Sequence, residues 1–366
     1  MLKSLKLKNF TVFPEVTLQF GSQLNVFIGE NGTGKSHLLK LAYSILAASS
    51  RGEKESGAPT PTADALANGL AKKLRGVFRP DQLGHLVRRD GSHAPVEPCR
   101  VDCDFAHAQL NMRFSIAAES TSETEITECP EEWIFPGKSP IFVPTKEIIS
   151  LGAEFVSTYE LSEIRFEETW RDAALRLAYP LAKGPRIEQV KPLLEPLETL
   201  LGGTIELASG GSFHLVNASG RREMHLVAEG LRKIAMLARM IATGAFVNKG
   251  YLFWDEPEAN LNPKVVKLIA RTILHLAGNN TQVFIATHSL FLMRELYILQ
   301  QAEFQGLDSR CFGLHSNQDG SVSVQQGKTM DDVGDITSLD EELHQSERYM
   351  DIEVEAGSKA AKEPRP

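Results

Sequence analysis

The chain has 366 residues and a formal net charge of −8, and its composition, 42% apolar and 23% charged, is that of an ordinary globular protein. Eleven Asp/Glu and four Lys/Arg fall within residues 330–366, so this segment carries −7 and the remaining residues only −1. A near-neutral body excludes an overall electrostatic attraction for nucleic acid and leaves only a local basic patch for that role.

An apolar strand is predicted over residues 24–28 and a helix over 37–42, and a glycine-rich loop joins them. The loop, Gly29-Glu30-Asn31-Gly32-Thr33-Gly34-Lys35-Ser36, fits the phosphate-binding pattern G-x-x-x-x-G-K-[ST] at every fixed position. Glycines let backbone N–H groups turn inward around phosphate oxygens, and the N-terminus of the helix adds its positive dipole. The strand before the loop and the helix after it argue against a chance glycine-rich turn.

This loop predicts a nucleotide-binding site that uses Mg²⁺. Lys35 can reach the β- and γ-phosphates, and the Ser36 hydroxyl can be a ligand of Mg²⁺. The residues expected to bind the nucleotide here are Glu30, Asn31, Gly32, Thr33, Gly34, Lys35, Ser36 and His37.

The middle of the chain is less regular. Residues 51–69 have the composition of a loop or a disordered segment, and residues 70–90 form a basic helical stretch. This stretch is either a solvated basic face, which is the simpler interpretation, or a surface for nucleic acid or a protein partner. Alternating apolar residues over 101–118 predict the strands of a β-lobe.

Residues 159–201 are predicted to be helical, with a break at Gly184-Pro185. They show no sustained heptads, so we expect a compact helical lobe and exclude a long coiled-coil arm. Residues 202–207 and 213–216 then predict a hairpin, and it leads to a helix from Leu231 whose apolar residues recur at helical spacing.

Two buried strands follow in the second half, and each ends in polar residues. The strand over 250–254 ends in Asp255 and Glu256, at the strand end where open α/β sheets bind ligands. Asp255 is expected to hold Mg²⁺ and Glu256 to act as the general base on the attacking water. The strand over 281–286 ends in Thr-His-Ser, where His288 can hydrogen-bond the γ-phosphate or the water. Taken singly, the Asp255-Glu256 pair could be an ordinary acidic turn, and His288 could be an ordinary core or surface histidine.

The rest of the chain predicts a helix over 290–301, strands near 311–314 and 322–324, and an acidic helical segment near 339–349. Residues 353–366 have the composition of a disordered tail. No run approaches 18 apolar residues and no leader is visible, so we expect no membrane contact. The cysteines, Cys99, Cys103, Cys129 and Cys311, lack zinc-site spacing and are interpreted as reduced thiols of a cytoplasmic protein.

The order of these motifs along the chain resembles that of the ABC-type ATPases. The order is the phosphate loop, the acidic strand, the turn Glu258-Ala259-Asn260-Leu261-Asn262-Pro263 and Thr-His-Ser. Two hairpin strands over 5–10 and 16–20 ahead of the loop are typical of the RecF/SMC/OLD group within them. The chain is also similar to bacterial AAA/ABC-like ATP-binding proteins of anti-phage defence systems. The resemblance covers residues 1–50 and 205–300 well. It implies an α/β fold with a mostly parallel sheet flanked by helices, an N-terminal antiparallel β-lobe and a compact helical lobe.

The signature loop of this family departs from its usual form here. It matches residues 227–233, where Ala228 lacks the serine hydroxyl and Glu229 replaces a glycine. The resemblance implies that a second subunit contributes this loop to the γ-phosphate, through Glu229, Gly230, Arg232 and Asn260. Arg232 or Lys233 can supply positive charge in place of the serine, or both are solvated helix residues.

A short strand over 140–144 precedes the place where members of this family carry a further site residue, a glutamine. In the family, the equivalent strand leads to a glutamine near Mg²⁺, and here Lys146 and Glu147 occupy the comparable place, so either could approach the site. The predicted division of the chain is 1–50 and 205–330 for the two parts of the ATPase core, 51–140 for an insertion with the basic helix and the β-lobe, 141–204 for the helical lobe, and 331–366 for an acidic tail.

Three functions are compared. The first is an ATPase that forms a homodimer with ATP at the interface and acts as a switch for a separate effector, a nuclease or toxin, in phage defence or DNA maintenance. The second is a static ATP-bound scaffold or inhibitor with negligible hydrolysis, which the altered signature loop favours. The third, a transporter subunit, is disfavoured by the missing glutamine. DNA binding stays open, and hydrolysis is expected to be slow.

Overall fold

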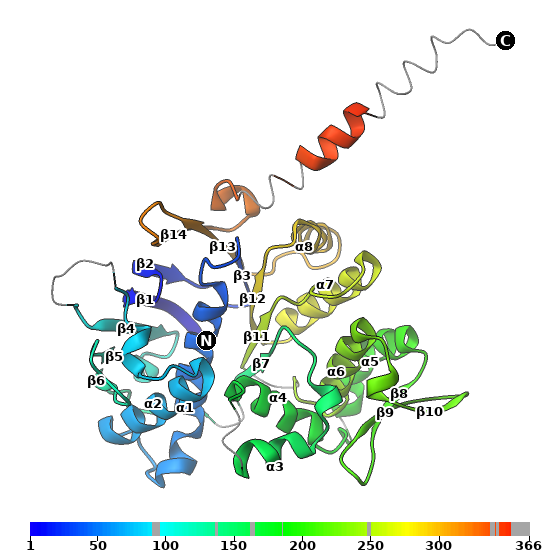
Figure 1. The fold of residues 1–366 in the computed structure, drawn as a ribbon, viewed down its shortest axis with the longest axis horizontal. Coiled ribbons are helices and arrows are strands. Elements are labelled where there is room, and N and C mark those ends of the chain that lie inside the picture. The colour runs from blue at the N-terminus through cyan, green and yellow to red at the C-terminus, as the bar shows by residue number, and fades with distance from the viewer. Residues whose placement is uncertain are drawn as a thin grey trace.

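The structure is a computed structural model, and it describes residues 1–89, 96–135, 138–161, 165–184, 186–246, 250–336, 341 and 344–352. Three sheets and the helices around them make up this part of the chain (Figure 1). The α-helices are α1 (Lys35–Ser56), α2 (Ala63–Phe78), α3 (Glu154–Leu161), α4 (Glu168–Ala178), α5 (Arg186–Leu201), α6 (Glu229–Ala242), α7 (Pro263–Gly278) and α8 (Leu290–Ala302). Short 3₁₀ helices are η1 (Leu83–Leu86), η2 (Ala108–Leu110), η4 (Ile149–Leu151), η5 (Met224–Leu226) and η6 (Met330–Val333).

A mostly parallel sheet forms the centre, with the strand order β14-β13-β3-β12-β11-β7. Its strands are β3 (Leu24–Gly29), β7 (Ile141–Val143), β11 (Tyr251–Asp255), β12 (Gln282–Thr287), β13 (Ser309–Ser316) and β14 (Val322–Gly327). All neighbours pair in parallel except β13 and β14. Every residue of β3, β11 and β12 is buried, because helices cover both faces of the sheet, and this explains their continuous apolar sequences. The predicted fold class is confirmed.

An antiparallel sheet lies beside this core, with the order β2-β1-β4-β5-β6. Its strands are β1 (Leu2–Phe10), β2 (Phe13–Gln19), β4 (Cys99–Phe105), β5 (Met112–Ile116) and β6 (Glu125–Glu128). The predicted hairpin near the start of the chain and the predicted strands over 101–118 therefore belong to one sheet. Buried and more exposed residues alternate along β4 and β5, as expected for a sheet with one face on the core.

The prediction of a loop or disordered segment over 51–69 is correct only for residues 57–62, which connect two helices. Helix α1 continues to Ser56 and ends at Gly57, which has φ of 71° and donates its N–H to Glu53. Helix α2 begins after Thr62, whose side chain accepts a hydrogen bond from the Ala65 N–H. The basic stretch over 70–90 is α-helical only as far as Phe78, and the 3₁₀ helix η1 follows in it. Tertiary packing outweighs local composition here, because the Trp133 ring lies against α1 and leaves no room for a side chain at Gly52.

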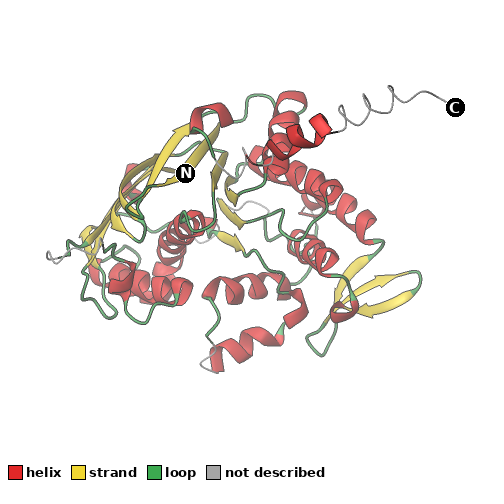
Figure 2. Ribbon diagram, turned by 45° about the horizontal axis from the view of Figure 1, so that its top comes forward, coloured by secondary structure: helices red, strands yellow, loops and turns green. Residues whose placement is uncertain are grey.

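Helices α3 and α4 pack together in the region predicted as a compact helical lobe, whereas α5, the third helix of that region, packs against α6 and α7. The longest helix of the described residues, α1, has 22 residues. A small antiparallel sheet follows, made of β8 (Thr204–Leu207), β9 (Phe213–Asn217) and β10 (Gly220–Glu223). Figure 2 shows this sheet at one edge of the molecule, away from the other two. Strand β7, which the predicted division assigns to the helical lobe, lies in the central sheet. The predicted domain boundaries otherwise stay predictions.

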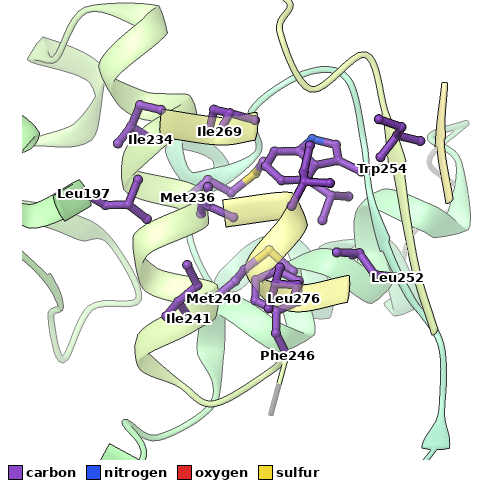
Figure 3. Packing of buried hydrophobic residues seen from close by; sticks show 14 of the residues in the cluster. Leu197, Ile234, Met236, Met240, Ile241, Phe246, Leu252, Trp254, Ile269 and Leu276 are labelled. Atoms are coloured by element: carbon purple, nitrogen blue, oxygen red, sulfur yellow. The ribbon is translucent and has the colours of Figure 1, made fainter. Parts of the chain in front are cut away.

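Two apolar clusters pack against opposite faces of the central sheet. Val26 and Ile28 of β3 belong to one cluster, and Phe27 between them belongs to the other, as the alternation of a strand requires. Trp254 is 1% exposed and packs with Met236 and other residues of α6 and α7 (Figure 3). This packing fixes α6 and α7 against β11, the strand that carries Asp255.

The cysteines of the described residues are unpaired, and Cys99, Cys103 and Cys311 are buried while Cys129 is exposed. No helix within the described ranges is long and apolar enough to cross a bilayer. Residues 344–352 are helical and lie in the acidic segment predicted near 339–349, and the tail predicted to be disordered, 353–366, falls outside the described residues.

Candidate active site

The phosphate loop joins the end of β3 to the start of α1, as predicted. Gly32 and Gly34 both have φ of 85°, in the left-handed region that favours glycine. A Cβ atom on Gly34 would lie 2.8 Å from Val12 and 2.9 Å from Phe13, so the turn between β1 and β2 supports the loop. A Cβ atom on Gly32 would meet nothing within 4 Å, so this side is open. An open concave backbone of this kind fits a phosphate group.

Lys35 is the first residue of α1, and its side chain lies along the loop. It is 5% exposed, and its Nζ donates hydrogen bonds to the carbonyl oxygens of Gly29, at 2.7 Å, and Glu30, at 2.9 Å. Burial lowers the pKa of Lys35, whereas the carboxylates of Glu256 and Asp255 act in the opposite direction. The ammonium group is therefore held against the backbone of the phosphate loop itself.

The two predicted ligands of Mg²⁺ are in contact. Ser36 Oγ donates a hydrogen bond to Asp255 Oδ1 at 3.0 Å. Burial raises the pKa of Asp255, and hydrogen bonds from Ser36 and Thr145 oppose that shift. A hydroxyl and a carboxylate side by side fit a magnesium ion, which prefers oxygen ligands. Thr145 follows β7 and was not singled out from the sequence, because no motif marks it.

Glu256 and His288 come from neighbouring strands and meet at the carboxyl ends of β11 and β12. His288 Nδ1 lies 2.7 Å from Glu256 Oε2. Glu256 has φ of 47°, which is unusual for a residue with a side chain, and such conformations are often found at functional sites. The structure thus brings together the two residues predicted to act on the attacking water, and their roles stay predictions.

Glu258 is a third carboxyl group at this place, and no sequence motif predicts a role for it. Thr287 Oγ1 donates a hydrogen bond to Glu258 Oε1, and Glu258 Oε2 is buried without a hydrogen-bond partner among the described residues. Burial, and after it the nearby Glu256, raise the pKa of Glu258 to about 7. Ligand atoms of Glu256, Glu258 and His288 lie within 4.8 Å of one another. The only sequence signal for Glu258 is its position two residues after Glu256.

The signature region lies at the N-terminus of α6, beside the turn that carries Glu256. Asn260 Nδ2 donates a hydrogen bond to Glu229 Oε1 at 3.0 Å, and a Cβ atom on Gly230 would lie 2.8 Å from the Asn260 carbonyl oxygen. Glu229 and Asn260 are exposed, so a second subunit could reach them. Arg232, which is half-buried, forms an ion pair with Glu147, with 2.9 Å between Nε and Oε1.

The structure contradicts one of the two interpretations of Lys233. Its side chain is 3% exposed, so it is not a solvated helix residue. Its Nζ donates to the carbonyl oxygens of Glu256, at 2.7 Å, and Ala259, at 3.1 Å, and its role as a source of positive charge for a phosphate stays a prediction. Burial lowers the pKa of Lys233 to about 8, although Glu258 and Glu256 oppose the shift.

The remaining loop residues differ in their surroundings. Glu30 and Asn31 are exposed, whereas Thr33 is buried and its hydroxyl donates to the Glu30 carbonyl oxygen at 2.8 Å. The His37 ring packs edge-on against Phe78, and its Nδ1 has no hydrogen-bond partner among the described residues. Burial and the neighbouring Lys40 lower the pKa of His37, so its imidazole is neutral near pH 7.

Lys146 and Glu147 occupy the place of the family's glutamine, and of these two Glu147 contacts residues next to the site. Its carboxylate accepts hydrogen bonds from Ser150 N and Oγ and pairs with Arg232, whereas Lys146 is exposed. The loop after β7 therefore reaches the site through Thr145 and reaches α6 through Glu147.

The basic stretch over 70–90 is not a uniformly solvated face. Lys73 is 4% exposed, and its Nζ contacts the carboxylates of Glu168 and Asp172 in α4. Asp172 also accepts hydrogen bonds from Tyr43 and Arg51 of α1. This buried ion cluster joins α1, the helix that begins at the phosphate loop, to the helical lobe.

Family models match most of the chain in two parts. Residues 1–130 match the model described as "AAA ATPase domain", and residues 133–294 match "AAA domain, putative AbiEii toxin, Type IV TA system". Two curated relatives are DNA replication and repair proteins RecF. The one from Pediococcus pentosaceus is 43% identical over 44 residues and the one from Staphylococcus haemolyticus 43% over 49 residues. These matches cover 12% and 13% of the relatives' length and the same shares of this chain.

Solved structures of SMC head domains have the same fold. An SMC head bound to the C-terminal winged-helix domain of ScpA aligns with a TM-score of 0.55 and 14% identity, over 90% of this chain and 98% of that one. An SMC head with an extended coiled coil, bound to the C-terminal domain of ScpA from Pyrococcus furiosus, gives 0.53 and 14%, over 90% and 96%. Identities this low show the fold alone.

Proposed function

We propose, from the premise that the chain belongs to the RecF/SMC/OLD group of ABC-type ATPases, that it binds ATP with Mg²⁺ and hydrolyses it. The observation that carries the proposal is the contact between Ser36 and Asp255, with the Glu256–His288 pair beside it. A metal-ligand pair, a base with its partner and a phosphate loop thus converge at the carboxyl ends of adjacent strands.

Each residue would have a separate task in hydrolysis. The loop's backbone N–H groups and Lys35 would bind the phosphates and neutralise the charge that develops in transfer. Glu256 would accept a proton from the water whose oxygen bonds to the γ-phosphorus, while the bond from that phosphorus to the β,γ-bridging oxygen breaks and ADP leaves. His288 would orient that water or the phosphate. Ser36 and Asp255 would hold Mg²⁺, which would supply positive charge to the phosphates.

Replacing Lys35 tests the site directly. Lys35→Ala is expected to abolish ATP binding, because the loop loses the ammonium group that would bind the phosphates. Binding is measured by equilibrium titration with a fluorescent ATP analogue, with Lys264→Ala, an exposed lysine of α7, as the control. Normal affinity in Lys35→Ala would refute the assignment of the phosphate loop.

We further propose that two copies form a homodimer with ATP at the interface. The exposed Glu229 and Asn260 at the start of α6 would then face the γ-phosphate held by the other copy, together with Gly230 and Arg232. Arg232 would have to leave Glu147 to reach that phosphate. The chain would therefore have two states, one with Arg232 paired with Glu147 and one with Arg232 at the phosphate of the other copy. ATP would stabilise one state, and hydrolysis would release it.

The output of this switch is proposed to act on a separately encoded effector, a nuclease or toxin, in phage defence or DNA maintenance. The SMC heads of the same fold are bound to a winged-helix domain of another protein, and a family model that matches this chain is described as a putative toxin-system domain. These likenesses support partner binding only by analogy. The buried free thiols of Cys99, Cys103 and Cys311 support a cytoplasmic location.

A static, ATP-bound scaffold is the second candidate, since Glu229 and Arg232 are both engaged within their own chain. The two candidates differ in turnover. Hydrolysis that is lost in Glu256→Gln supports the switch, and an equal, negligible rate in both proteins supports the scaffold.

A further inference from the structure

The turn that carries Glu256 is fixed by backbone contacts on both sides. The Glu256 N–H donates to the Ala286 carbonyl oxygen at 2.9 Å, and the Ala259 N–H donates back to the Glu256 carbonyl oxygen at 3.1 Å. Glu256 itself has φ of 47°. A residue other than glycine keeps this conformation only where its surroundings hold it, so the contacts on its carbonyl group matter.

Lys233 provides the strongest of these contacts from outside the turn. Its Nζ lies 2.7 Å from the Glu256 carbonyl oxygen and 3.1 Å from that of Ala259, and the side chain is 3% exposed. An ammonium donor makes a stronger hydrogen bond than a neutral one, and burial excludes the water that would otherwise compete. Lys233 therefore clamps the two ends of the turn together.

Lys233 stands in α6, whose N-terminus is the surface proposed to meet a second subunit. The same helix touches the turn at two further points, through the Glu229–Asn260 hydrogen bond and the close packing of Gly230 on the Asn260 carbonyl group. The start of α6 and the turn are thus one packed unit. A shift of α6 would move the Glu256 backbone with it.

We infer that Lys233 is a positioning residue, which holds the Glu256 carboxylate in place for the attacking water and makes that placement depend on α6. The inference rests on the proposed hydrolysis, and it adds the means by which contact with a second subunit at α6 would regulate the base.

The test compares Lys233→Met with Arg239→Met in the full chain. Arg239 is a matched control, because it lies in α6, is 4% exposed and donates to two backbone carbonyl oxygens, those of Leu177 and Tyr179, away from the site. Lys233→Met is expected to lower kcat about 100-fold with the KM for ATP within about twofold of wild type, since a base displaced by about 1 Å loses such a factor. Arg239→Met is expected to lower thermal stability and leave kcat within about twofold.

A double-mutant cycle separates positioning from general damage. In the Glu256→Gln background, Lys233→Met is expected to have no further effect on turnover, because the group that it positions is already gone. Lys233→Gln, which keeps an N–H donor without the charge, takes its place if the methionine variant does not fold, with the same expected split between kcat and KM.

The possible outcomes are distinct. Equal kcat losses in Lys233→Met and Arg239→Met, a loss confined to KM, or additive effects in the Glu256→Gln background would each overturn the inference. A wild-type chain that binds ATP but does not hydrolyse it would overturn the proposed function, and this inference with it.

Discussion

His288 Nδ1 lies 2.7 Å from Glu256 Oε2, although the two residues follow different strands of the central sheet. Strands β11 and β12 pair in parallel and in register up to Asp255 and Ala286, so their next residues leave the sheet at the same edge. The contact lacks hydrogen-bond geometry, because Glu256 Oε2 has no hydrogen-bond partner among the described residues. The His288 side chain is 47% exposed, so its ring stays accessible to water or a substrate.

His288→Ala is expected to lower kcat about 100-fold or more, within the range of a general acid–base partner, and to leave ATP affinity nearly unchanged. The side chain is exposed, so thermal stability should change little. Steady-state kinetics and a binding titration on the same preparation measure the two effects. An unchanged kcat would exclude a role for His288 in the reaction.

Gly34→Ala is expected to destabilise the protein more than Gly32→Ala. Both positions have φ of 85°, so both variants carry a strain of about 1–2 kcal/mol. Only at Gly34 would the new methyl group also press on Val12 and Phe13. Urea denaturation gives the two free energies of unfolding, and equal losses would show that the β1–β2 turn does not support the loop.

The pKa of Glu258, raised by burial to about 7, predicts a pH-dependent stability. Between the ordinary carboxyl range and about pH 7, the folded chain keeps a proton on Glu258 that the unfolded chain has released, so stability falls as pH rises. Glu258→Gln removes this term, and its stability relative to wild type is expected to increase from pH 5 to pH 8. Thermal melts without nucleotide across that range measure the difference, and parallel curves would contradict the prediction.

Much of the fold could be predicted because the central strands have continuous apolar sequences. The residues of β3, β11 and β12 are buried on both faces and so form continuous apolar runs, and each run ends in the polar residues of the site. Parallel pairing then brings these ends together, which is why the meeting of Ser36 with Asp255 and of Glu256 with His288 could be expected.

Contacts between segments far apart in sequence could not be predicted in this way. Lys233 has the same local pattern as a surface lysine, and only the packing of α6 on the turn after β11 buries it. The pair of Glu147 with Arg232 likewise joins a loop and a helix that no motif connects. The helical course of residues 51–56 depends on Trp133, which lies elsewhere in the chain.

The proposed function requires that ATP join two copies of the chain into a dimer and that its hydrolysis release them. Light scattering of Glu256→Gln, with and without Mg-ATP, measures this association as mass in solution. We expect the mass to double with Mg-ATP in Glu256→Gln and to stay unchanged in Glu256→Gln that also carries Lys35→Ala. A mass that ignores nucleotide would contradict the shared interface and support the static scaffold.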